Sequence, residues 1–253
     1  MIKTGHWPRR WLAPGGIAAF LCLWQFISGF YTPEQLPPPL AVVAGLRELA
    51  ASGALYEHIW VSLGRFGVSF LLATITAVPL GIVVGWYTWS LQALDPLIQL
   101  LRPISPIAWF PLAVLWFGIG NAPAVFIIFL AAFFPILLTT IRAVRGIDPL
   151  YLRVAANFGA GPGYRFTRVV LPAAFPQIMT GLHIAIGVAW IHLVAGEMLG
   201  AQSGLGFLIV DARNFLRTDL IIVGMLVVGS LGLVINEAVG RLEKRIIRGW
   251  GGR

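Results

Sequence analysis

Two histidines lie in one long apolar stretch, residues 169–196, which contains no lysine, arginine, aspartate or glutamate. A neutral histidine donates one hydrogen bond, and a protonated histidine attracts an anion. His183 and His192 are nine residues apart, about two and a half helical turns, so we expect their rings on opposite faces and not in one site. With Trp190 between them, they are candidate residues of a polar pathway. Hydrogen bonding between neighbouring helices is the alternative use.

Glu197 directly follows this stretch. A carboxylate at the centre of a bilayer costs on the order of 2.5–3.5 kcal/mol. We therefore expect Glu197 to face other helices or a water-filled path, which makes it a further candidate pathway residue. The alternative is a structural role in which the carboxylate bonds the glycine-rich turn at 203–206. An exposed carboxylate in the path would repel an anion.

Prolines recur at Pro103, Pro106 and Pro111, beside Ser105 and Trp109. Each proline removes a backbone donor and leaves a carbonyl without its helical partner, which lipid does not tolerate. The spacing predicts a broken helix in the protein interior. Ser105 and Trp109 are accordingly candidate pathway residues.

The composition places these residues in a membrane protein. Of the 253 residues, 58 % are hydrophobic and 11 % are charged, against about 25 % charged in a soluble domain. The net charge of +8 is explained by basic loops on one side of a membrane better than by nucleic acid. A single cysteine, Cys22, excludes an internal disulfide, and no Cys/His spacing indicates a metal site.

Six stretches are long enough to span a bilayer, which takes about 20 apolar residues. The 39 residues from 103 to 141 are too long for one span, and turn-forming residues at 118–123 divide them. We interpret the first stretch as an uncleaved helix; a signal peptide is the alternative, but no A-x-A site follows. The predicted spans are residues 11–33, 66–94, the two halves of 103–141, 169–196 and 220–236.

Basic residues orient the chain. With the N-terminus inside, fourteen of the 18 lysines and arginines fall in cytoplasmic segments, and only Arg47, Arg65, Arg213 and Arg217 fall outside. We divide the chain into three parts. Residues 1–61 hold the first span and an amphipathic helix at the outer interface, 62–241 form a core of five spans with a loop at 142–172, and 242–253 form a basic cytoplasmic tail.

The cytoplasmic loop predicts a short helix. Asp148 is a good N-cap, Pro149 fits the first turn, and Gly159 stands where a C-cap glycine belongs, after about Phe158. Such a helix is too short to be stable alone, and its aromatic ends and small centre suit a groove on a partner. An interfacial helix beside lipid headgroups is the alternative.

The loop resembles the EAA motif of ATP-binding-cassette (ABC) importer permeases, which reads E-A-A, three residues, G, nine residues, I-x-L-P. Gly159 takes the glycine position, and Leu171-Pro172 take the L-P position. The chain departs from the motif at its start, where arginine replaces the glutamate. The resemblance implies a coupling surface for an ATPase made of Tyr151, Arg153, Val154, Ala155, Ala156, Gly159, Leu171 and Pro172.

Further stretches resemble the nitrate, sulfonate, taurine and bicarbonate branch of this family. They are residues 101–112, 115–120, 196–199 and 203–209. The resemblance implies an all-α permease of the type I importer fold in a bacterial inner membrane, with both termini cytoplasmic. It implies as partners two ABC ATPase subunits, a second permease copy, a periplasmic or lipid-anchored solute-binding protein and membrane lipid, with no nucleic acid.

The chain has no G-x-x-x-x-G-K-[ST] sequence, so we expect no cofactor in it, with ATP and Mg²⁺ bound by the partner ATPases. Arg213 and Arg217 are four residues apart, so on a helix they would share a face that can contact the binding protein. Pairing with Asp211 or Asp219 is the alternative.

Two other functions agree less well with the sequence. A self-contained channel or secondary transporter would need ionisable residues in mid-span, and few exist. A membrane enzyme is disfavoured because the chain has no paired carboxylates, H-E-x-x-H or G-x-S-x-G.

Overall fold

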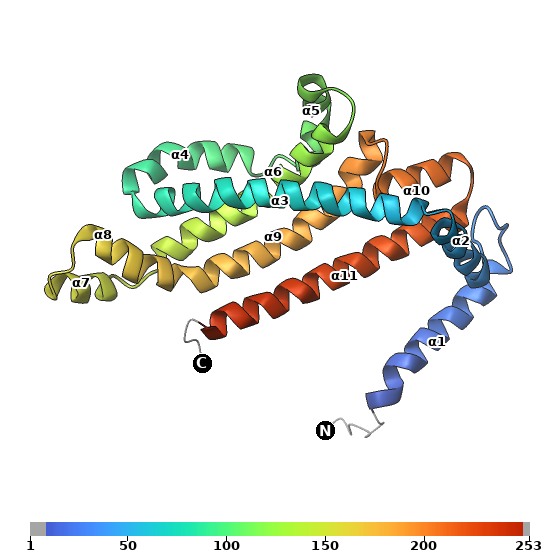
Figure 1. The fold of residues 1–253 in the computed structure, drawn as a ribbon, viewed down its shortest axis with the longest axis horizontal. Coiled ribbons are helices and arrows are strands. Elements are labelled where there is room, and N and C mark those ends of the chain that lie inside the picture. Colours follow the sequence, from blue (N-terminus) through green and yellow to red (C-terminus); the bar gives the residue numbers. More distant parts are fainter. Residues whose placement is uncertain (1–8, 250–253) are drawn as a thin grey trace.

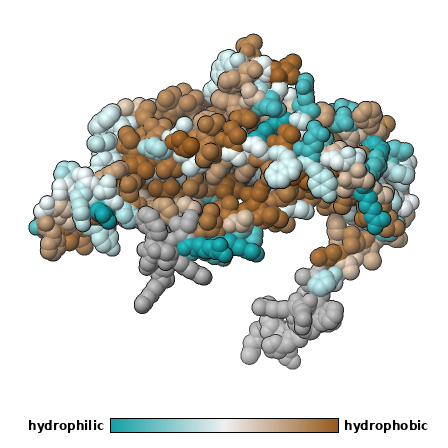
Figure 2. All heavy atoms as spheres, in the orientation of Figure 1, coloured by the Kyte–Doolittle hydropathy of each residue, from teal (hydrophilic) through white to brown (hydrophobic). Residues whose placement is uncertain are grey.

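A computed structural model describes residues 9–249, with side chains for 14–245, and every element in these ranges is helical. Four long helices run side by side through the molecule, α3 (Ala54–Trp86), α6 (Asn121–Arg145), α9 (Leu171–Gly200) and α11 (Thr218–Gly249). All four contain segments long and apolar enough to cross a membrane. Figure 2 shows hydrophobic atoms over the middle of this bundle and hydrophilic atoms gathering toward its ends.

The predicted count of six spans is not confirmed by the described residues. Four helices of the described part qualify, or five if one bent pair counts as a single span. That pair is α4 (Thr88–Leu101) with the 3₁₀ turn Pro106–Trp109 and α5 (Phe110–Phe117), bent by 86°. The first helix, α1 (Arg9–Ser28), has a shorter apolar part, Pro14–Ser28, and leans away from the bundle in Figure 1.

The helix break predicted from the prolines is present, because α4 ends at Leu101 and regular α-helix resumes at Phe110. Its surroundings differ from the prediction of a buried break. Residues 102–105 are exposed in the single chain rather than enclosed by it. The rigid prolines end the helix, but only packing decides what covers the break.

The second span was misplaced by the sequence pattern. It was predicted at 66–94, whereas α3 begins at Ala54 and ends at Trp86, and Tyr87 in extended backbone separates it from α4. The prediction began the span after Arg65, because charged residues were taken to limit each span. Ser62 and Arg65 lie inside the helix because other helices neutralise them, as described below.

Small residues allow the central helices to pack closely. A Cβ atom built on Gly81 of α3 would lie 2.7 Å from the Cβ of Thr140 on α6. Gly181 of α9 meets Thr139 of α6 in the same way. Without a hydrophobic force between helices in lipid, such contacts are a main source of helix association. The core between them contains Ile128, Ile136, Leu137, Ala185 and Leu193, all buried.

Two shorter helices close one end of the bundle. A helix, α2 (Pro39–Ala51), lies where the amphipathic helix was predicted, and it buries Val42 and Leu49 in a cluster shared with α11. The second, α10 (Leu205–Asn214), begins within the glycine-rich turn at 203–206. Its apolar residues Leu205 and Leu208 are buried in that cluster, which explains why the segment is ordered as a helix.

The opposite end carries the predicted loop helix, α7 (Pro149–Asn157). The Asp148 Oδ1 accepts a hydrogen bond from the Leu150 N–H at 2.8 Å, and Gly159 has φ +78°. Both predicted caps are therefore confirmed. Next come α8 (Pro162–Arg165) and a π turn (Phe166–Val170), which continue into α9 without a break, so the fifth span begins before the predicted residue 169.

Candidate functional site

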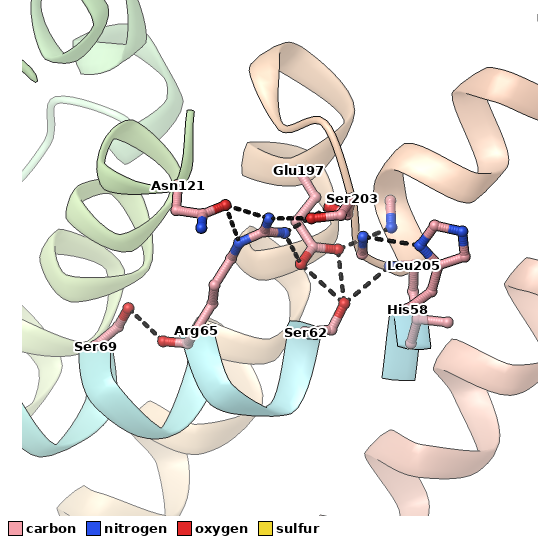
Figure 3. A network of polar contacts seen from close by, with 10 residues as sticks. His58, Ser62, Arg65, Ser69, Asn121, Glu197, Ser203 and Leu205 are labelled. Carbon is pink, nitrogen blue, oxygen red and sulfur yellow. Dashed lines mark hydrogen bonds and ion pairs between the residues drawn. The ribbon is translucent and has the colours of Figure 1, made fainter. Parts of the chain in front are cut away.

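A buried polar network joins three helices near the end of the bundle that carries α10 (Figure 3). The Arg65 Nη1 of α3 lies 2.7 Å from the Glu197 Oε1 of α9, and the two side chains are 4 % and 0 % exposed. Ser62 Oγ donates to the same carboxylate at 2.8 Å. The Arg65 Nε also donates to the Asn121 Oδ1 at the start of α6, at 3.1 Å. A buried ion pair is stable only when its other polar atoms are satisfied as well, and here they are.

The same network holds the turn before α10. The Glu197 Oε2 accepts a hydrogen bond from the Gly206 N–H at 2.9 Å, which is the bond expected in the structural alternative for this residue. Arg65 donates to the Ser203 carbonyl at 2.6 Å, and the Leu205 N–H donates to Ser62 Oγ at 2.8 Å. Four segments thus meet at one carboxylate and one guanidinium.

Glycine is required at one position of this turn. Gly204 has φ +104°, and a Cβ there would lie 2.5 Å from the Glu197 carboxylate carbon. Its N–H donates to the His58 Nδ1 at 3.1 Å, so that nitrogen acts as an acceptor. The backbone therefore approaches the ion pair more closely than any other residue type allows.

Arg65 is the functional residue that the sequence analysis missed, because it was assigned to an outer segment. A usable signal was present. One arginine borders the apolar run of the second span, and one glutamate borders the run of the fifth, both on the outer side. Opposite charges at matching depth on two spans are expected to pair.

The two histidines have separate surroundings, as expected. The His183 Nδ1 lies 2.8 Å from Glu243 Oε2, and its Nε2 lies 2.9 Å from Asn236 Oδ1, both on α11. The buried Trp190 donates from Nε1 to the Val228 carbonyl of α11 at 3.1 Å. All three contacts join α9 to α11, and interhelical hydrogen bonding was the alternative to a pathway role.

His192 instead lines a cavity of about 300 Å³ between the broken segment, α6 and α9. The Nδ1 of His192 lies 2.8 Å from the Val188 carbonyl one turn earlier. Ser105 lies in the break between two residues that line the cavity, and Trp109 follows one turn later. The lining residues are Arg102, Ile104, Pro106, Leu130, Ala131, Phe134, Pro135, Leu138, Thr139, Arg142, Val188 and His192.

The loop helix α7 presents a surface with no contact to the bundle core. Tyr151, Val154 and Phe158 are exposed, Phe158 by 88 %. Arg153, Ala156 and Gly159 are also exposed, whereas Ala155 is half-buried. Leu171 and Pro172 are half-buried at the start of α9. The predicted coupling residues thus lie at one end of the bundle (Figure 1), and their role stays a prediction.

Arg213 and Arg217 do not share a helical face, which corrects the prediction. The helix α10 ends at Asn214, and Leu216 adopts a positive φ of 56°, so the chain turns between the two arginines. Arg217 lies 2.7 Å from Glu48 and 2.8 Å from Asp219, which is the paired alternative. Arg213 has no ion pair with a described residue.

The contacts between Glu48 and Arg217 shift the pKa values of both groups. The hydrogen bonds from the Arg217 guanidinium lower the pKa of the Glu48 carboxyl below its ordinary value. The carboxylates of Asp219 and Glu48 raise the pKa of Arg217. In the described part of the chain, no three histidine, cysteine or acidic side chains are grouped as a metal ion would require.

Comparisons with known proteins identify relatives over most of the chain. Residues 77–248 match the family described as "binding-protein-dependent transport system inner membrane component". A putative ABC transporter permease of Methanocaldococcus jannaschii is 38 % identical, over 90 % of this chain and 88 % of that protein. The taurine transport permease TauC of Escherichia coli is 34 % identical, over 93 % and 88 %. The nitrate import permease NrtB of Leptolyngbya laminosa is 39 % identical, over 76 % and 69 %.

The fold has a solved counterpart. A chain of the MetNI methionine ABC transporter in inward-facing conformations aligns with a TM-score of 0.62. The alignment covers 78 % of this chain and 96 % of that chain, at 17 % sequence identity. The likeness concerns the arrangement of helices.

Proposed function

Because the chain belongs to the family of binding-protein-dependent transport system inner membrane components, and so to the permeases of ABC importers, we propose that its solute is a small oxyanion. Nitrate, bicarbonate and sulfonates, including taurine, are the candidates. The observation that carries this proposal is that relatives named for taurine and for nitrate transport match most of the chain. No relative reported above supports a self-contained channel or secondary transporter.

The geometry supports coupling to a separate ATPase. The exposed aromatic and apolar residues of α7 stand outside the bundle on a helix capped at both ends. A short capped helix of this kind can fit a groove on a partner subunit. Closure of that subunit would then move the loop and the start of α9 together. Because α8 and α9 are continuous, such a movement would reach the middle of the bundle.

The complete transporter would then contain two copies of this chain, two ATPase subunits and an outer solute-binding protein, in the cell membrane with both termini inside. ATP and Mg²⁺ would be bound by the ATPase subunits. The exposed break at residues 102–105 and the exposed apolar residues around it leave a surface available to the second copy.

The test is ATPase activity of the purified complex in lipid, with the binding protein loaded in turn with nitrate, bicarbonate, taurine and an alkanesulfonate. We expect one of these anions to stimulate hydrolysis. Stimulation by an uncharged or cationic solute alone would contradict the proposed solute class and leave the permease assignment intact.

A further inference from the structure

We propose that Arg102 and Arg142 form an oxyanion-binding site in the open cavity that His192 also lines. The inference rests on the proposed function and specifies where this chain itself binds the solute. Arg102 comes from the break after α4, and Arg142 comes from the last turn of α6.

The charge of the cavity favours an anion. Its charged lining consists of the two guanidinium groups, and no aspartate or glutamate lines it. Neither arginine has an ion pair or a side-chain hydrogen bond with a residue that the structure describes, whereas Arg65 and Arg217 are each bound to carboxylates. A guanidinium presents five N–H donors in a planar fork that matches the oxygens of nitrate, carboxylate or sulfonate groups.

The remaining wall strengthens this attraction. Leu130, Phe134 and Leu138 recur at four-residue spacing on the face of α6 that ends at Arg142, over about 18 Å at 1.5 Å per residue. Charges interact more strongly beside an apolar wall than in bulk water. The volume of about 300 Å³ corresponds to about ten water molecules at ~30 Å³ each, so a small hydrated anion fits.

The cavity is open to water, because Arg102 and Arg142 are both exposed. Pro135 of α6 lines it, and a proline inside a helix leaves the carbonyl four residues earlier without its usual donor. Such interruptions occur at membrane depth where they face protein or water. The two arginines also belong to different elements, so a change in the angle between the broken segment and α6 would alter their separation and release the anion.

The test uses the fact that Cys22 is the only cysteine of the chain. In a Cys22→Ser background, Ile104→Cys places a thiol at an exposed position of the cavity wall in the assembled permease–ATPase complex in lipid. The labelling rate is measured with a methanethiosulfonate reagent that carries a sulfonate and with its trimethylammonium counterpart. We expect the sulfonate reagent to react faster by about tenfold, and sodium nitrate to slow it at constant ionic strength.

Arg102→Gln and Arg142→Gln should each remove most of this preference, and Arg142→Lys should retain it. The matched control is Arg145→Gln, because Arg145 lies in the same last turn of α6 and is exposed like Arg142, but does not line the cavity. Its ratio of rates should stay within about twofold of the parent's. The lysine variant shows that a loss in the glutamine variant comes from charge and not from misfolding.

Equal rates for the two reagents in the parent, or an unchanged ratio in both arginine variants, would overturn the site. A different experiment tests the proposed function: it is contradicted if no oxyanion-loaded binding protein stimulates the ATPase. Labelling that prefers the anionic reagent and depends on the two arginines would still establish the site in that case.

Discussion

Arg65 and Glu197 depend on each other because neither charge reaches water. The carboxylate has no exposed surface and accepts from Arg65, Ser62 and the Gly206 N–H. Removing one member of such a pair leaves the other buried and unpaired. The pair therefore stabilises the outer junction of α3, α6, α9 and the turn before α10.

We expect Arg65→Met to lower the free energy of unfolding by about 3–5 kcal/mol, because it leaves the Glu197 carboxylate uncompensated. The measurement is thermal or denaturant unfolding of the permease in detergent. Arg213→Met is the matched control, since Arg213 is exposed and has no ion pair with a described residue. Equal stability of the two variants would show that the pair is dispensable, and Arg65→Met with Glu197→Leu should recover part of the loss.

Glu48 gives the chain an acid-sensitive contact with Arg217, on the side predicted to face outward. Its pKa is lowered by the hydrogen bonds from Arg217, so the contact stabilises the fold above the ordinary glutamate pKa. That stabilisation is lost as the pH falls through the lowered pKa of the folded state. The parent should therefore be more stable than Glu48→Gln at neutral pH, and the difference should vanish in acid. A difference that persists at low pH would refute the assignment to Glu48.

The loop helix α7 is an element whose form depends on its two ends. Asp148 caps its start, and Gly159 ends it in the left-handed region, where a side chain costs about 1–2 kcal/mol. No atom lies within 4 Å of a Cβ built there, so the cost is conformational and local to the loop. The bundle itself does not depend on this residue.

We expect Gly159→Val to reduce transport and ATPase stimulation strongly, while thermal stability and assembly of the helices stay close to the parent's. Co-purification of the ATPase and solute uptake are the measurements. Gly161→Ala is the control, because Gly161 has φ −66° and also has open space. Unaffected transport in Gly159→Val would defeat the coupling role of α7.

At the scale of the whole molecule, the two ends of the bundle carry different tasks. The helices α2 and α10 lie at one end, and α7 and α8 lie at the other (Figure 1). The excess of basic residues around the α7 end predicts that this end faces the cytoplasm. The cavity extends along α6 to Arg142, in the last turn before the α7 end.

The orientation can be tested with single thiols in a Cys22→Ser background. Tyr151→Cys on α7 and Asn214→Cys at the end of α10 both occupy exposed positions. An impermeant thiol reagent added outside intact cells should label Asn214→Cys and leave Tyr151→Cys unlabelled until the membrane is opened. The reverse pattern would invert the predicted topology.

The sequence alone determined the features that depend on neighbours along the chain. Composition and apolar length established a helical membrane protein, and the caps at Asp148 and Gly159 placed α7 to within a residue. The spacing of Gly159 and Leu171-Pro172 also led to the correct family. These features follow from local propensity, hydrogen bonding within a few residues and the thickness of a bilayer.

Only the tertiary structure decided which charged residues belong inside. Arg65 lies within α3 because Glu197, 132 residues later, neutralises it. Arg217 pairs with Glu48, 169 residues earlier, and Arg102 meets the face of α6 that carries Arg142. The energy of burying a charge depends on the partners that packing brings from distant segments. The linear sequence pattern does not identify those partners. It therefore predicted that the second span begins only after Arg65.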